Sequence, residues 1–300
     1  MLPLLLCTSQ AISKDTMLVV RRAAMTARGA IAAHVSPRPP FAAHAARRAM
    51  LRSTSTYTVA AIEDGDDAAW RKLLSDADFL AAVEDSEDLA AAFVRRMDQQ
   101  AVEISRLGVP EGNDPEIWTY AAHLFTHEDP AVLATARVAV WKDDGNAMIF
   151  QTAAASTAVP QEVLSRVVST AKTEVENLAS CDKIAGVARL DGSHGLCAWV
   201  RDTKAWERFE EPERSAVEAI ATNTPRPGHS VLGKGTFEAA KEAWTTLALG
   251  FADRAEVGEA AIFRGAGAKL AGINWLHDTS PEALTGSGGA TAAFHFESDS

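Results

Sequence analysis

Cysteine is scarce in this chain, whose 300 residues include only Cys7, Cys181 and Cys197. None of the three stands in a CxxC pair, and three scattered cysteines are too few for a disulfide framework or a zinc site. We therefore expect no metal centre built on cysteine. We expect Cys181 and Cys197 to behave as small, buried apolar residues.

Long apolar runs are missing as well. Beyond the N-terminus no eighteen consecutive residues are apolar, so the sequence predicts no membrane-spanning helix. The opening MLPLLLC has no positive charge before it and is therefore a poor secretory signal. With 47% hydrophobic and 23% charged residues, the composition is that of a globular chain able to bury a sizeable core.

Acidic residues are nearly absent from the first 60 positions, where Asp15 is the sole example. The basic residues there are Lys14, Arg21, Arg22, Arg28, Arg38, Arg47, Arg48 and Arg52. This stretch carries +7, and because the whole chain carries −11, the remaining 240 residues carry −18. A basic, Ala- and Ser-rich start without acid is typical of an organelle transit peptide.

We therefore expect residues 1–55 to be a transit peptide for the mitochondrion, with a plastid as the alternative destination. Met17 is an alternative start, and processing is expected between Arg48 and Ser55. A basic arm that binds nucleic acid is the competing interpretation. It fits less well because the acidic remainder of the chain would repel phosphates, so we expect no nucleic-acid partner.

The rest of the chain predicts an α+β fold in two regions. Residues 56–115 place apolar side chains at helical spacing, for example Trp70, Leu73 and Leu74, and predict a helical region that ends at the breaker cluster VPEGNDP. Residues 116–300 alternate between strand and helix patterns. The predicted strands are 131–141, 147–154, 183–190, 258–264 and 268–275, and the predicted helices are 161–178, 204–222 and 236–252.

Several segments resemble the C-terminal catalytic domain of malonyl-CoA decarboxylases, which has the acyl-CoA-binding fold of the N-acetyltransferase superfamily. AMIFQTAAAST at 147–157 is similar to the family's strand before the coenzyme-binding helix, and LSRVVSTAKTEVENL at 164–178 is similar to that helix. AGVARLDGSHGLCAWV at 185–200 is similar to its serine-bearing strand and loop. The resemblance covers about residues 118–297 and implies a mixed sheet flanked by helices.

The most specific match lies in the last forty residues. The family has a histidine, then Asn-Gly-Ala, Arg-Ile-Asn-Trp, an Asp, a Ser, and a Ser-x-Gly before an Asn-Tyr pair. The matching residues here are Gly267, Ala268, Ile273, Asn274, Trp275, Asp278, Ser280, Ser287 and Gly289. The resemblance implies conversion of malonyl-CoA to acetyl-CoA and CO₂ in fatty-acid metabolism, with neither a metal nor an organic cofactor.

The reactive positions of the family are altered. Loss of CO₂ from a malonyl thioester places negative charge on the thioester oxygen, so a donor is needed there and an acid must then protonate carbon. By register, the family's serine falls on Asp191, with Ser193 two residues away, and its histidine falls on Phe263. The Asn-Tyr pair is replaced by Ala293 and Phe294, and residues 151–161 lack the glycines that would let bare amides approach a diphosphate.

From these positions we predict the site residues. Asp191, Ser193 and His295 are the candidate catalytic residues, with His277 and His194 as alternative proton donors. The candidate substrate-binding residues, carried over from the resemblance, are Arg166 on the coenzyme-binding helix, Asn274 and Ser287. His123 and His127 have helical metal-ligand spacing but no HExxH glutamate, so we interpret them as structural.

Two alternatives to decarboxylation follow from the altered reactive positions of the family. The chain could be a catalytically degenerate pseudoenzyme that serves as a structural subunit of an organellar complex, or it could bind or transfer acyl groups from acyl-CoA with different donors. An acyl-CoA ligand and a homo-oligomer or larger organellar assembly are the expected partners.

Overall fold

The computed structural model describes residues 57–100, 102–112, 114–124, 131–191, 195–223, 232–256 and 258–297. The predicted transit peptide, Ser193, His194 and His127 lie outside the described residues. None of the described helices is long and apolar enough to cross a membrane.

Residues 57–98 form four short helices, as the apolar spacing predicted. They are α3 (Val59–Glu63), α4 (Asp67–Leu74), α5 (Ala77–Asp85) and α6 (Glu87–Asp98). Each begins at a Ser, Thr or Asp whose side chain accepts a hydrogen bond from a first-turn amide. Trp70, Phe79 and Phe93 are fully buried, and Trp70 meets both phenylalanine rings edge-on.

The described strands form one mixed sheet of seven strands in the order β1-β2-β3-β4-β5-β7-β6. They are β1 (Glu103–Glu111), β2 (Glu116–Leu124), β3 (Ala131–Trp141), β4 (Asn146–Ala154), β5 (Lys183–Arg189), β6 (Lys269–Asn274) and β7 (Thr291–Phe296). Every neighbouring pair is antiparallel except β4 and β5, which are parallel. The predicted strands 131–141, 147–154, 183–190 and 268–275 are confirmed.

The predicted helical region is wrong beyond residue 98, because residues 103–111 form β1. Ile104 and Arg106 of this strand pair with Ala122 and Tyr120 of β2, so backbone pairing outweighs the weak local pattern. His123 also lies on a strand, β2, where residues four apart do not share the geometry of a helical metal site.

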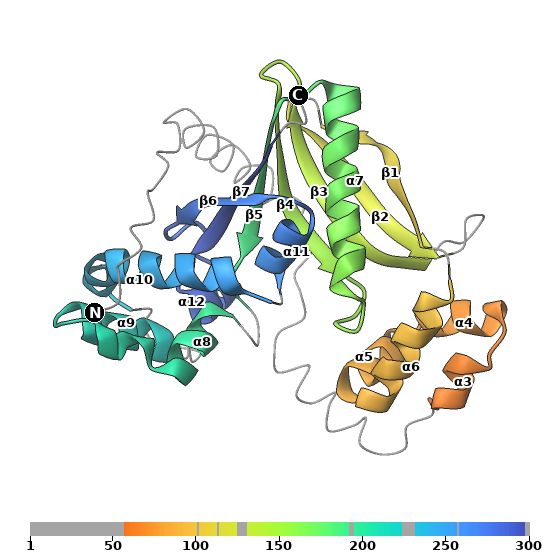
Figure 1. Cartoon of the computed structure of the whole chain (residues 1–300), viewed down its shortest axis with the longest axis horizontal. Coiled ribbons are helices and arrows are strands. Elements are labelled where there is room, and N and C mark those ends of the chain that lie inside the picture. Colours follow the sequence, from red (N-terminus) through yellow and green to blue (C-terminus); the bar gives the residue numbers. More distant parts are fainter. Residues whose placement is uncertain are drawn as a thin grey trace, which may run out of the picture. The chain divides into compact units, whose positions relative to one another are not determined.

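The remaining helices are α7 (Gln161–Ala179), α8 (Leu196–Thr203), the 3₁₀ turn η1 (Ala205–Arg208), α9 (Glu213–Thr222), α10 (Lys234–Arg254), α11 (Glu259–Gly265) and α12 (Pro281–Ser287). α7 lies lengthwise over β2, β3 and β4, while α8, α9, α10 and α12 gather at one side of the sheet (Figure 1). The predicted helix 204–222 is divided into η1 and α9. The predicted α+β class is confirmed.

Residues 258–264 were predicted as a strand, and this prediction is wrong because residues 259–265 form the helix α11. The helix packs against α7 and β5. Ser165 of α7 donates to the carbonyl of Ile262 at 3.0 Å, and Gly265 keeps the two helices close. A short apolar run such as AAIF is compatible with a strand or a helix, and here the tertiary contacts favour the helix.

The ladder between β4 and β5 is short, and its end positions the candidate site. Their pairing ends at Ile149 and Gly186, although β4 continues to Ala154 and β5 to Arg189. Phe150 makes a bulge at the same point, because the register between β3 and β4 shifts there. The last residues of β4 and β5 therefore have no ladder hydrogen bonds to each other.

Candidate functional site

A row of three polar side chains crosses the sheet where β5 ends. Arg189 of β5 is directly opposite Thr291 of β7, and Thr291 is directly opposite Asn274 of β6. Directly opposed residues on neighbouring strands project from the same face of a sheet. The three side chains therefore lie side by side, at the end of β5 beyond its ladder with β4.

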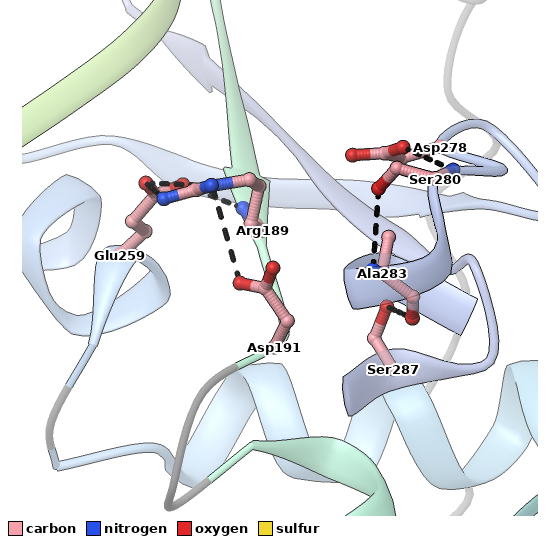
Figure 2. A network of polar contacts seen from close by, with 7 residues as sticks. All are labelled: Arg189, Asp191, Glu259, Asp278, Ser280, Ala283 and Ser287. Carbon is pink, nitrogen blue, oxygen red and sulfur yellow. Dashed lines mark hydrogen bonds and ion pairs between the residues drawn. The ribbon is translucent and has the colours of Figure 1, made fainter. Parts of the chain in front are cut away.

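Glu259, the first residue of α11, holds Arg189 from two directions (Figure 2). Its Oε1 accepts from Arg189 Nε at 3.2 Å and lies 3.2 Å from Arg189 Nη2, while its Oε2 accepts from the backbone amide of Arg189 at 2.6 Å. The turn before α11 depends on Gly258, whose φ of 86° suits glycine. This carboxylate thus engages both the side chain and the main chain of one residue.

Two further carboxylates lie farther from the guanidinium than Glu259 does. Asp191 Oδ1 lies 3.9 Å from Arg189 Nε, and Asp278 lies across from Arg189 in Figure 2. Glu259 is the main cause of a raised pKa of Arg189, and Asp191 and Asp278 contribute to it. Burial raises the pKa of the Glu259 carboxyl, against the opposing effect of Arg189. We call Arg189, Asp191, Glu259 and Asp278 the Arg189 cluster.

The second half of the row is formed by neutral polar groups. Thr291 Oγ1 lies 3.2 Å from His277 Nδ1, so the imidazole is held beside the row. The side-chain nitrogen of Asn274 is fully buried and has no hydrogen-bond acceptor among the described residues. A buried amide donor of this kind is costly unless a ligand or water accepts from it.

The predicted turn residues between β6 and β7 fix this part of the site. Asp278 Oδ1 accepts from the amide of Ser280 at 2.9 Å, and Ser280 Oγ accepts from the amide of Ala283 at the start of α12. Ser287 was predicted to bind substrate, and this interpretation needs correction. Its side chain is buried, and its hydroxyl donates to the carbonyl of Ala283 at 3.0 Å, which gives it a structural role.

The predicted proton donor His295 does not reach the Arg189 cluster. It lies four residues beyond Thr291 on β7, about 13 Å along an extended strand, where it is opposite Ala185 and Lys269. His277 is the described histidine that contacts the row. Arg166, predicted to bind substrate, is exposed on α7 with Nη2 3.5 Å from the carbonyl of Val102.

Phe263 and Phe294 do not line the site either. Both are fully buried, and their rings stack at 5.4 Å with an interplanar angle of 13°. Phe263 packs so closely on Gly186 that a Cβ there would lie 2.3 Å from its ring. Asp191, His295 and the two phenylalanines do not converge on one site: Asp191 belongs to the Arg189 cluster, His295 lies along β7, and the phenylalanines belong to the core.

The turn between β4 and α7 is the position of the family's coenzyme-binding turn, and its sequence lacks the glycines that would admit a diphosphate. α7 begins after Pro160 without a side-chain cap, so its first-turn amides are not engaged by a capping side chain. One amide of the turn, that of Thr157, donates to Glu84 Oε1 at 3.1 Å. The amides of Ala155, Ala158 and Val159 are also engaged, by Leu133 and Ser156, so most of the amides of this turn already have acceptors within the chain.

Three important residues were missed by sequence reasoning, namely Arg189, Glu259 and Thr291. Arg189 could have been noticed as the charged end of an otherwise apolar strand. Glu259 could not, because it lies 70 residues away in the chain and within a segment predicted as a strand. Among the described residues, no group of three His, Cys, Asp or Glu side chains is arranged to hold a metal ion.

Both described cysteines are buried, as predicted, and burial raises the pKa of Cys181 to about 11 and that of Cys197 to about 12. At neutral pH both are therefore thiols, and neither is a nucleophile in this state.

Comparison with solved structures identifies the fold. Malonyl-CoA decarboxylase from Rhodopseudomonas palustris superposes with a TM-score of 0.56 at 16% identity, over 92% of this chain and 75% of that chain. The enzyme from Cupriavidus metallidurans gives 0.51 at 14% identity, over 80% and 74%, and that from Agrobacterium vitis gives 0.51 at 14%, over 86% and 80%. No protein-family model and no curated protein sequence matches the chain. The predicted resemblance to these decarboxylases is thus confirmed at the level of the fold.

Proposed function

We propose that this chain binds an acyl-CoA thioester on the malonyl-CoA decarboxylase fold, with the acyl group at the row formed by Arg189, Thr291 and Asn274. The observation that carries the proposal is the position of this row, next to the end of the ladder between β4 and β5. A thioester carbonyl at the β6 end of the row would meet the buried amide donor of Asn274, and the rest of the ligand would extend past Thr291 and Arg189 toward the ends of β4 and β5, which no longer pair with each other.

The other end of the ligand is assigned to the start of α7. Helix N-termini favour anions because their first amides are unpaired and the helix dipole is positive there. A diphosphate at Gln161 would also lie on the same helix as Arg166, whose exposed guanidinium is available to a phosphate. Because the turn before α7 lacks glycine and most of its amides are already bonded, a diphosphate there would depend on the amides at the start of α7 and on side chains.

Calorimetric titration of the purified full chain tests this proposal. We expect acetyl-CoA to bind more tightly than CoA, because only the thioester carries the acyl carbonyl that Asn274 would contact. Asn274→Asp removes the amide donor and should weaken acetyl-CoA binding by about tenfold while leaving CoA unchanged. If neither ligand binds, the proposal of acyl-CoA binding is replaced by the alternative that the chain is a catalytically degenerate, structural subunit of an organellar assembly.

Decarboxylation of malonyl-CoA is the second candidate, and the contact between Thr291 and His277 favours it. In this reaction the bond between the carboxylate and the α-carbon breaks, CO₂ leaves, and the electron pair forms an enolate of the thioester. Asn274 would donate to the enolate oxygen, and protonated His277 would return a proton to the α-carbon. His277→Gln should lower acetyl-CoA formation by about a hundredfold or more. If the unmodified chain forms acetyl-CoA from malonyl-CoA no faster than a mixture without protein, decarboxylation is ruled out as its function.

A further inference from the structure

The charge balance of the Arg189 cluster bears on which acyl groups the proposed site accepts. A malonyl group differs from an acetyl group by a carboxylate, so its recognition needs a cation with open donors. Arg189 stands at the end of the row and is the described cation placed there. Its Nε and Nη2 face Glu259 Oε1, and Glu259 is anchored in turn by the Arg189 amide.

The other charged groups around Arg189 add to this effect. Asp191 approaches it from the segment after β5, with Oδ1 3.9 Å from Arg189 Nε, whereas Asp278 lies farther away, on the loop between β6 and α12. His277 lies on the same loop, beside Thr291 of β7. Two carboxylates therefore lie against one guanidinium and a third lies farther off, and a ligand carboxylate placed here would meet like charges.

An uncharged acyl thioester does not have this difficulty. Its carbonyl oxygen needs a neutral hydrogen-bond donor, and the buried amide nitrogen of Asn274 lies in the same row. The next opposed pair along this face of the sheet is Ala293 and Gly272, and both residues are small and uncharged, so neither places a charge beside the acyl carbonyl.

We propose that Glu259 is a specificity-determining residue, an internal counter-anion that occupies Arg189 and makes the site prefer uncharged short-chain acyl-CoA over malonyl-CoA. Glu259 acts through Arg189 and so is a positioning residue rather than a catalytic one. The inference rests on the proposed acyl-CoA binding, and it adds the substrate class.

The test compares dissociation constants of the full chain for acetyl-CoA and malonyl-CoA. The unmodified chain should bind acetyl-CoA at least about tenfold more tightly. Glu259→Gln keeps the shape and one of the two acceptor oxygens but removes the charge. It should reduce the ratio of the malonyl-CoA to the acetyl-CoA dissociation constant by about tenfold, with little change for acetyl-CoA. Glu256→Gln, the same change at an exposed position three residues earlier, should leave the ratio as it was. Equal affinities in the unmodified chain, or an unchanged ratio in Glu259→Gln, would overturn the inference.

A second comparison needs no variant and so does not depend on Glu259→Gln folding. Malonamyl-CoA replaces the malonyl carboxylate by an amide of the same size. It should bind the unmodified chain more tightly than malonyl-CoA, and the reverse order would overturn the inference. Binding of all the thioesters without discrimination removes the role of Glu259 alone, whereas absence of binding by any of them also removes the proposed function.

Discussion

At the scale of single residues, Gly186 determines how closely α11 approaches β5. A Cβ at this position would lie 2.3 Å from one ring carbon of Phe263 and 2.6 Å from another. Phe263 cannot yield easily, because it is fully buried and stacks on Phe294. Ala268, three residues beyond the end of α11, donates its backbone amide to the Phe263 carbonyl, which further fixes the end of the helix.

Gly186→Ala should therefore lower the free energy of unfolding by about 1–3 kcal/mol, the usual cost of overpacking a core. Gly250→Ala is the matched control, since no atom lies within 4 Å of its added Cβ and it stands inside α10. The free energy of unfolding of this control variant should rise by about 0.5–1 kcal/mol, because alanine has a higher helix propensity than glycine. Urea unfolding of both variants measures the difference, and equal stabilities would contradict the packing described for Phe263.

The residues of the site differ in how far the sequence could predict them. Asp278, Ser280 and Gly289 were found because their contacts are local turns and caps within one segment. Arg189 and Glu259 were not paired, because a contact between strand and helix 70 residues apart leaves no local pattern. Residues 291–296 were not predicted as a strand, so the sequence could not show that the candidate His295 stands about 13 Å from Thr291 along β7.

At the scale of elements, α5 begins at a cap that also joins it to the segment before α3. Asp76 Oδ1 accepts from the amides of Asp78 and Phe79, and Oδ2 accepts from the hydroxyl of Tyr57 at 2.7 Å. The Tyr57 hydrogen bond, followed by the amide of Asp78, lowers the pKa of Asp76. The ionised carboxylate is thus the form that the folded chain favours.

Asp76→Ala should cost about 1–2 kcal/mol of unfolding free energy at neutral pH, as other helix N-caps do. A carboxyl with a depressed folded pKa contributes stability above its ordinary pKa, near 4, and loses it as the pH falls through the lower folded value. The difference in unfolding free energy between the unmodified chain and Asp76→Asn should therefore become smaller below about pH 4. Denaturant unfolding as a function of pH measures it, and a gap that widens in acid would contradict this assignment.

Elements with strong periodicity were predictable, and elements decided by tertiary pairing were not. α7 carries a continuous apolar stripe and was predicted almost to the residue. β7, with the sequence TAAFHF, has weak strand propensity in its alanines and forms because β5 and β6 both pair with it. β1 and α11 were misassigned for the same reason: β1 is decided by its pairing with β2, and α11 by its packing against the distant α7 and β5.

At the scale of the whole molecule, the contrast between a basic start and an acidic remainder predicts import into an organelle. Residues 1–55 as a transit peptide and a mitochondrial location stay predictions, with a plastid as the alternative. Sequencing the N-terminus of the protein isolated from organelles tests them. We expect it to begin between residues 48 and 56, and an N-terminus upstream of Arg48 on protein recovered outside both organelles would contradict the prediction.

The central claim is that an acyl-CoA thioester binds where β4 and β5 lose their pairing. Hydrogen exchange of the full chain with and without saturating acetyl-CoA tests it most directly, because it locates the ligand on the backbone. We predict slower exchange at residues 150–154, 187–189 and the first turn of α7, with no change in β1. Unchanged exchange at residues 150–154 and 187–189 under saturating acetyl-CoA would contradict the account.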